Sequence, residues 1–201
     1  MPIFNYAARE ITCKIVYYGP GRSGKTSSLQ AIYAKVPASR RGTMYSLATQ
    51  GDLTLFFDYL PLELGRISGY LTRFQLYTVP GQPQYAQTRR LVLHGADGIV
   101  FVADSQLARM EENLDSLRDM HEALLMHGVD PRNVPLVFHY NKQDLPEPLV
   151  ARPEELDAIL NFRGMPSFPG DALRGRGVFE ALRAVSVQVL RRFAEPARAR
   201  I

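Results

Sequence analysis

The residues with the clearest chemical role are the eight from Gly19 to Thr26, which read Gly-Pro-Gly-Arg-Ser-Gly-Lys-Thr. They fit the G-x-x-x-x-G-K-[ST] pattern of a phosphate-binding loop, and they follow the apolar run Ile15–Tyr18. Glycines leave room for successive backbone N–H groups to curl around phosphate oxygens, and the start of a helix adds positive potential. The sequence therefore predicts a triphosphate site between a strand and a helix.

Two side chains of this loop have separate predicted roles. Lys25 is expected to reach the β- and γ-phosphates, where it also assists catalysis, and the Thr26 hydroxyl is expected to bind a magnesium ion. The remaining residues predicted to contact the nucleotide here are Gly19, Gly21, Arg22, Ser23, Gly24 and Ser27. A glycine-rich turn that binds no ligand is the alternative interpretation.

A second candidate lies at Thr78–Gln82, where the sequence Thr-Val-Pro-Gly-Gln follows an expected strand. A glycine at a strand end lets a backbone N–H approach a γ-phosphate, and the amide side chain after it can orient an attacking water. Gly81 is therefore predicted to contact the nucleotide and Gln82 to be catalytic.

The segment from Pro37 to Thr54 is polar and shows little periodicity. Long irregular segments in compact domains are usually functional or mobile. We expect this segment to fold over the phosphates and to bring the Thr54 hydroxyl to the magnesium ion, as a ligand and a catalytic group. A solvated loop without nucleotide contact is the alternative.

The third candidate is Asn141-Lys142-Gln143-Asp144, which directly follows an expected strand and lies 60 residues after Gly81 (141 − 81). An aspartate carboxylate accepts from both N1–H and the exocyclic amine of guanine, and Asn141 is placed to face N7 and O6. Because open α/β sheets bind ligands at the carboxyl ends of their strands, this spacing predicts a guanine site. Lys142 and a backbone amide near Ala172 are included in the predicted contacts.

The elements that position these groups follow from apolar periodicity. Gly98–Asp104 is continuously apolar, which is typical of a parallel strand covered on both faces by helices. Residues 61–66 are rich in turn formers and are expected to join two antiparallel strands, and residues 3–7 are expected to pair with the first central strand. Strands are predicted at 10–18, 55–60, 69–79, 98–104, 136–140 and 165–168, and helices at 26–36, 106–127, from 153 and from 178.

Composition limits the class of protein. With 201 residues, 46% of them hydrophobic, the chain is expected to form one domain, followed by a flexible basic tail over residues 194–201. The mild excess of 24 Lys and Arg over 20 Asp and Glu is not gathered into a basic helix, so nucleic-acid binding is not expected. The single Cys13 suits a reducing cytoplasm, and neither a membrane-length apolar run nor a lipid-anchor motif is present.

Taken together, the three motifs resemble those of small Ras-like GTPases. The runs Lys14–Gly21, Thr54–Asp58, Leu76–Gln82 and Gly98–Ser105 resemble, more narrowly, the bacterial MglA family of polarity GTPases. The resemblance implies a three-layer α/β P-loop fold with a mostly parallel central sheet flanked by helices. It also implies GTP, GDP and Mg²⁺ as ligands, with the Asp58 carboxylate behind the waters of the magnesium ion. The implied partners are a roadblock-fold, MglB-like regulator and polarity or motility effectors, with a monomer as the switch unit.

One position departs from the family's pattern. Where the family has an arginine that acts as an arginine finger in cis, this chain has Leu53, which carries no charge. Because such a finger contributes about 10³ to 10⁵ in rate, we expect slow GTP hydrolysis. A GTP-dependent scaffold with negligible turnover is the alternative, and an unrelated P-loop kinase or ATPase is disfavoured because Asn141 and Asp144 would then lack a purpose. Residues 37–54 and 78–90 are expected to move when the γ-phosphate leaves.

Overall fold

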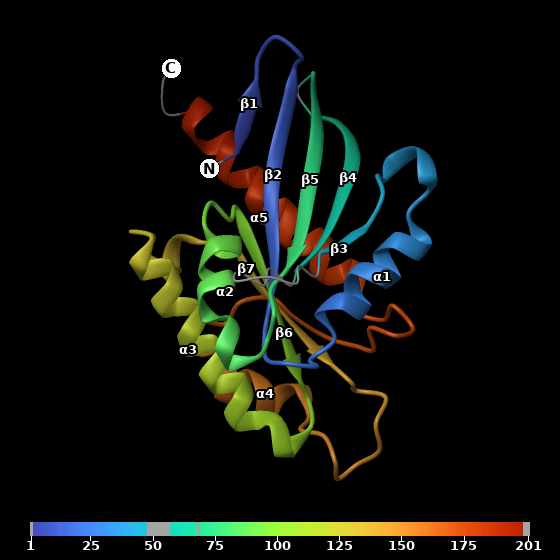
Figure 1. Cartoon of the computed structure of the whole chain (residues 1–201), viewed down its shortest axis with the longest axis vertical. Helices are drawn as coiled ribbons and strands as arrows, with labels where there is room; N and C mark the ends of the chain where they lie inside the picture. The colour runs from blue at the N-terminus through green and yellow to red at the C-terminus, as the bar shows by residue number, and fades with distance from the viewer. Residues whose placement is uncertain (1, 48–56, 68, 199–201) are drawn as a thin grey trace.

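The computed structural model describes residues 2–47, 57–67 and 69–198 of the chain, so Leu53 and Thr54 lie outside the described residues. Within these ranges the strands form one eight-stranded sheet with helices on both faces (Figure 1). The strands are β1 (Ile3–Asn5), β2 (Glu10–Tyr18), β3 (Tyr45–Leu47), β4 (Phe57–Ile67), β5 (Tyr70–Thr78), β6 (Gly98–Asp104), β7 (Leu136–Asn141) and β8 (Ser167–Pro169). The α-helices are α1 (Lys25–Lys35), α2 (Ala86–Leu93), α3 (Met110–Met126), α4 (Pro153–Leu160) and α5 (Val178–Arg198), with 3₁₀ turns at Ala38–Arg40, Pro83–Tyr85, Leu107–Arg109 and Pro131–Asn133.

The sheet has the order β3-β4-β5-β2-β6-β7-β8, and β1 pairs with β2 beside this path. The pairs β5–β2, β2–β6, β6–β7 and β7–β8 are parallel, whereas β3–β4, β4–β5 and β1–β2 are antiparallel. Because parallel strands end at the same edge, the segments after β2, β5, β6 and β7 meet there. The predicted mostly parallel α/β sheet and the antiparallel pairing of the N-terminal segment with β2 are confirmed.

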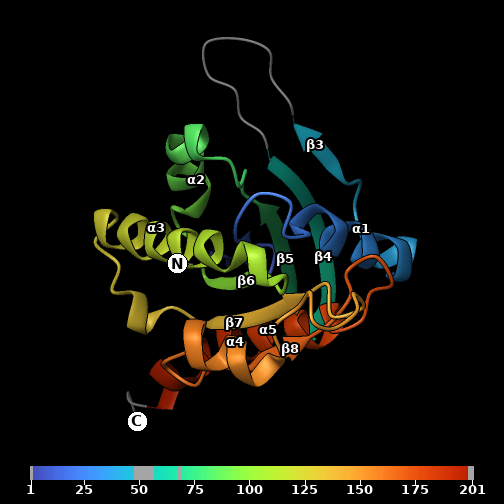
Figure 2. The ribbon, with the colours of Figure 1, turned by 90° about the horizontal axis from the view of Figure 1, so that it is seen from below.

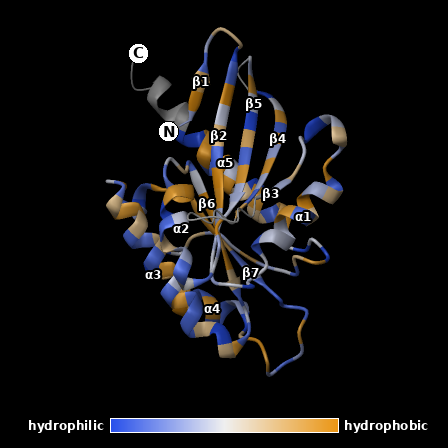
Figure 3. Cartoon of the chain, viewed as in Figure 1, coloured by the Kyte–Doolittle hydropathy of each residue, from blue (hydrophilic) through white to orange (hydrophobic). Residues whose placement is uncertain are grey.

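Two apolar clusters hold the helices against the two faces of the sheet (Figure 2). Residues of α1 and α5 pack against one face, and residues of α2, α3 and α4 pack against the other. All seven residues of β6 are buried, as expected for a strand covered on both faces. In contrast β5 alternates between buried and more exposed positions, and hydrophobic and hydrophilic colours alternate along it in Figure 3.

The predicted turn over residues 61–66 is wrong, because these residues belong to β4. The Pro61 carbonyl accepts a hydrogen bond from the Gly42 backbone N–H at 2.9 Å, on the side of β4 that faces away from β5. In a strand the N–H and C=O of one residue point to the same side, so the missing Pro61 N–H lies on that outer side and removes no bond to β5. The other turn former of this stretch, Gly65, has φ +94° and lies at a register shift between Glu63 and Gly65, so the strand continues through it with an irregularity in its pairing.

Two short elements and one helix end also differ from the prediction. The strand at Tyr45–Leu47 and the helix at Ala86–Leu93 were not predicted, because each is shorter than the window over which periodicity can be recognised. The helix α5 continues to Arg198, so residues 194–198 are helical, and the predicted flexibility of residues 194–201 stays a prediction.

Candidate nucleotide site

The phosphate-binding loop connects the end of β2 to the start of α1 and packs against the ends of two other strands. Gly19 has φ +142° and Gly24 has φ +104°, a region that side-chain-bearing residues rarely adopt. A Cβ on Gly19 would lie 2.2 Å from the Val102 carbonyl oxygen, and a Cβ on Gly24 would lie 2.0 Å from Asn141 Nδ2. Close contacts with β6 and β7 therefore require glycine at both positions.

Lys25 lies inside this loop with only 6% of its surface exposed. Its Nζ donates to the Gly19 carbonyl at 2.9 Å and to the Pro20 carbonyl at 2.6 Å. Burial and, to a smaller extent, the nearby charge of Arg89 lower the pKa of Lys25 to about 7, and the Asp58 carboxylate opposes both effects. The ammonium group thus lies where an added anion would stabilise its charged form, as the predicted phosphate contact requires.

A group of hydroxyls surrounds the Asp58 carboxylate next to the loop. Thr26 Oγ1 and Thr78 Oγ1 donate to Asp58 Oδ2 at 2.6 and 2.9 Å, and Ser46 Oγ donates to Oδ1 at 2.7 Å. These are hard oxygen donors of the kind that Mg²⁺ prefers, although the described residues contain no group of three His, Cys, Asp or Glu side chains able to hold a metal by themselves. The donor set therefore fits a magnesium ion that is also held by phosphate oxygens.

Ser46 was not predicted as a site residue. It comes from β3, where the pairing with β4 places Ser46 directly opposite Asp58. Its only sequence signal was membership of the polar segment that was expected to fold over the phosphates. Thr54, the hydroxyl predicted from that segment, lies outside the described residues.

The phosphate loop and the hydroxyl group share a cavity of about 390 Å³. Its walls are formed by residues 22 and 24–27 of the loop, Ser46, residues 57–58 of β4 and residues 78–81. Gly81 closes one side, because a Cβ on it would lie 2.2 Å from Gly21 N and 2.5 Å from the Pro20 carbonyl carbon. The structure thus brings Gly81 against the loop of residues 19–26, and its contact with a nucleotide stays a prediction.

Gln82 does not line this cavity. Its side chain is exposed, and its Oε1 accepts from Gln84 Nε2 at 2.7 Å. It borders a neighbouring cavity of about 500 Å³, together with Gly21, Arg22 and Arg109. In this structure the predicted catalytic amide therefore borders the neighbouring cavity and not the cavity beside Lys25.

Asn141 ties the end of β7 to two segments that lie far from it in the sequence. Its Nδ2 donates to the Ser23 carbonyl at 2.7 Å, and its Oδ1 accepts from the Ala172 backbone N–H at 2.7 Å. The predicted base-binding residues and the phosphate loop therefore meet at the edge of the sheet. The Ala172 amide, predicted to contact the base, is used by Asn141 in this structure.

The other two residues of the base motif have partners that the sequence did not indicate. Lys142 adopts φ +71°, and its Nζ lies 2.5 Å from Asp104 Oδ2. Asp144 Oδ2 lies 3.2 Å from Nη1 of Arg174, a side chain that is 72% exposed. The same Nη1 lies 2.5 Å from Asp171 Oδ2, so Arg174 keeps a carboxylate partner if guanine replaces it at Asp144. Because an exposed ion pair is weak, guanine has only a small contact to displace at the Asp144 carboxylate.

A model of the ADP-ribosylation factor family matches residues 62–189, more than half of the chain. The chain belongs to this family of small GTPases. It is 52% identical over 190 residues to the mutual gliding-motility protein MglA of Myxococcus xanthus, covering 94% of this chain and 96% of the relative. The protein is therefore an MglA-type small GTPase, which binds guanine nucleotides and hydrolyses GTP.

More distant relatives come from eukaryotes. The Ras-related protein Rab-7a of Dictyostelium discoideum is 27% identical over 180 residues, which cover 89% of this chain and 82% of the relative. The ADP-ribosylation factor-like protein 6 of Caenorhabditis elegans is 28% identical over 179 residues, which cover 87% and 85%. In the described part of this GTPase no helix has the length and apolar character needed to cross a membrane.

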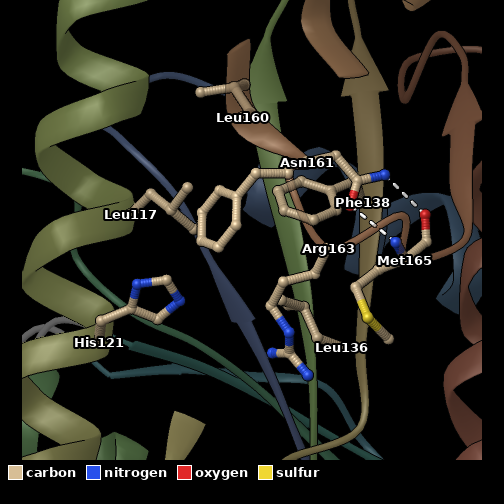
Figure 4. Close-up of a pocket in the computed structure, with 9 residues that line it drawn as sticks. Leu117, His121, Leu136, Phe138, Leu160, Asn161, Arg163 and Met165 are labelled. Carbon is tan, nitrogen blue, oxygen red and sulfur yellow. Dashed lines mark hydrogen bonds between the residues drawn. The ribbon is translucent and has the colours of Figure 1, made fainter. Parts of the chain in front are cut away.

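Another cavity lies away from the phosphate loop, between α3, β7 and the segment after α4 (Figure 4). It is bordered by Leu117, Phe138 and Leu160, while Asn161 Nδ2 donates to the Met165 carbonyl at 2.7 Å. Its volume of about 10 Å³ is close to the minimum needed by a single water molecule. This cavity is therefore a gap in the packing and not a nucleotide site.

Proposed function

We propose that this small GTPase is a switch in cell polarity and gliding motility, and that it hydrolyses GTP slowly. The observation that carries the role is the 52% identity with the mutual gliding-motility protein MglA over 94% of this chain. The switch unit is one domain acting as a monomer in the cytoplasm, and it is enriched at a cell pole. A roadblock-fold, MglB-like protein regulates its nucleotide cycle, and the GTP-bound form recruits polarity or motility effectors.

In this proposal the phosphates of GTP or GDP occupy the cavity of about 390 Å³ beside Lys25. Thr26 and Asp58 hold Mg²⁺, directly or through water, and Thr54 is the remaining proposed ligand. When bound, the metal ion neutralises developing charge on the β- and γ-phosphates. The oxygen donors that converge on Asp58 support this assignment.

Guanine is proposed to lie against Asn141 and Asp144, with Lys142 and the Ala172 amide beside it. Its N1–H and exocyclic amine donate to the Asp144 carboxylate in place of Arg174. Supporting this assignment, Asn141 already links the phosphate loop to residue 172 through two hydrogen bonds. A guanine base bound at Asn141 would therefore lie next to phosphates bound by the loop, as a single nucleotide requires.

Slow hydrolysis is proposed because Leu53 stands where the family has a charged arginine. Gln82 would then orient the attacking water without the family's arginine finger to stabilise the transition state, which removes a factor of about 10³ to 10⁵ in rate. The same substitution favours a second candidate, a GTP-dependent scaffold that binds effectors without useful turnover. The two candidates share one binding site and differ only in the chemical step.

Two measurements test the proposal. Chromatography of the nucleotide released from denatured protein, followed by calorimetry on stripped protein with Mg²⁺, is expected to show GDP or GTP and measurable heat with both. Absence of heat with either nucleotide would refute the proposed site. Single-turnover hydrolysis is then measured with and without an MglB-like regulator. Slow but measurable turnover supports the switch, and turnover no faster than that of free GTP under both conditions supports the scaffold.

A further inference from the structure

Arg89 on α2 is a charged residue that is almost completely buried, with 7% of its surface exposed. Its Nε lies 2.6 Å from Asp119 Oδ2 on α3, and its Nη1 donates to the Gln82 carbonyl at 2.6 Å and to the Pro80 carbonyl at 3.4 Å. These two carbonyls flank Gly81. The guanidinium thus joins α3 to the backbone on both sides of the glycine that closes the phosphate cavity.

The Asp119 carboxylate that pairs with Arg89 also accepts a hydrogen bond from a side chain of the sheet. Tyr18 Oη donates to Asp119 Oδ2 at 2.5 Å, and Tyr18 is fully buried at the end of β2, next to Gly19. Burial raises the pKa of Tyr18, and the contact with Asp119 raises it further, so the phenol stays protonated and donates. One network of charge-assisted hydrogen bonds therefore connects the strand that leads into the phosphate loop with the Pro80–Gln82 backbone.

We propose that Arg89 is a positioning residue for GTP hydrolysis, which fixes the Pro80–Gln82 backbone from which Gly81 and Gln82 act. The inference rests on the proposed function of this site. Because Arg89 bonds carbonyls on both sides of Gly81, it limits how the Gly81 N–H and the Gln82 side chain are presented to the γ-phosphate. It is not placed to touch the nucleotide, since the structure puts its contacts on Asp119 and the two carbonyls.

A positioning role and a purely structural role predict different results. Loss of positioning slows the chemical step and leaves nucleotide affinity unchanged, because misplacement of a reacting group by about 1 Å reduces a rate by up to about a hundredfold. A structural role lowers affinity, rate and melting temperature together. A double variant with Gln82 separates the two roles further, because substitutions at two residues that act together have effects that do not add.

The test compares the wild type with Arg89→Lys, which keeps the charge but loses the planar fork that reaches three acceptors. Arg118→Lys is the matched control, because Arg118 also lies on this side of the molecule but its side chain is 70% exposed and pairs with Asp115. For each protein, affinity for GDP and GTP, melting temperature and single-turnover hydrolysis with Mg²⁺ are measured. Gln82→Ala and the double variant Gln82→Ala with Arg89→Lys complete the set.

The expected result is that Arg89→Lys binds both nucleotides within about twofold of the wild type but hydrolyses GTP at least about tenfold more slowly. The control is expected to match the wild type, and Arg89→Lys is expected to cause a smaller loss in the Gln82→Ala background than in the wild type, because only its effect on the Gly81 N–H remains. Wild-type hydrolysis in Arg89→Lys, or additive losses in the double variant, would overturn the inference while leaving the proposed function intact.

Two further outcomes are decisive. If Arg89→Lys fails to fold or loses nucleotide, Tyr18→Phe is measured instead, since it removes one donor to Asp119 and keeps the ion pair. A selective loss of rate in Tyr18→Phe supports the positioning role, and parallel losses of rate, affinity and stability overturn it. If the wild type binds no guanine nucleotide, the proposed function itself fails, and the inference fails with it.

Discussion

The two halves of the nucleotide site are built differently. On the binding side, Lys25 and Asn141 are buried, and each is held by two hydrogen bonds to the surrounding chain. On the hydrolysis side, Gln82 is exposed, and its side-chain Oε1 accepts a hydrogen bond from the side chain of Gln84, two residues along the chain. The proposed binding side is therefore largely pre-organised in this protein, whereas the catalytic arrangement has to be completed by movement or by a partner.

The largest effect should come from supplying the arginine that this chain lacks at position 53. Leu53→Arg is expected to raise the regulator-stimulated single-turnover rate by about 10³ or more, because an arginine in cis stabilises charge in the transition state. Leu53→Lys is the matched control and should give a smaller gain, since lysine lacks the bidentate fork. An unchanged stimulated rate in Leu53→Arg would show that the missing arginine does not limit hydrolysis.

On the binding side, Asn141→Ala should remove both links that hold the base segment to the phosphate loop. It leaves the Ser23 carbonyl and the Ala172 N–H without their partner, at about 1–3 kcal/mol for each buried group. We expect the free energy of unfolding to fall by about 2–6 kcal/mol and GDP affinity to fall with it. Urea denaturation measures this change, with Asn133→Ala on an exposed turn as the control. Unchanged stability would mean that these links are not part of a pre-organised site.

The pH dependence of GDP binding should report the low pKa of Lys25. Burial holds that pKa at about 7 in this structure, and a bound phosphate favours the charged form and raises it. Binding at pH 8 should therefore take up a proton, and affinity should fall by at most about tenfold for each pH unit above 7. Calorimetry at pH 8 in two buffers of different ionisation enthalpy measures the uptake, with Lys25→Met as the control. Equal heats in both buffers for the wild type would contradict it.

The smallest effect is expected at Arg174, which competes with guanine for the Asp144 carboxylate. Its side chain is 72% exposed, so the ion pair contributes only about 0–1 kcal/mol. Arg174→Ala should therefore raise GDP affinity by no more than about fivefold. Competition binding with GDP and ADP measures the change. A marked loss of affinity would indicate that Arg174 contacts the nucleotide. An exposed side chain would then belong to the binding side, in addition to the buried Lys25 and Asn141.

Local sequence predicted the parts of the fold that are long or regularly patterned. The buried run of β6, the helix α3 and the loop between β2 and α1 all lie where their patterns place them. The pattern failed at residues 61–66, because composition suggested a turn and only the pairing of β4 with β5 and with Gly42 shows a strand. Short elements such as β3 and α2 depend on packing, so their own residues do not specify them.

The sequence by itself determined the ligand class, because the phosphate loop and the Asn141–Asp144 motif are contiguous stretches whose residue types fix their chemistry. Tertiary structure alone decided what holds these groups. The partners Ser46 with Asp58, and Arg89 with Asp119, lie 12 and 30 residues apart and show no shared motif. Such pairs arise because separate elements meet at one edge of the sheet, and no local pattern records which side chains then face each other.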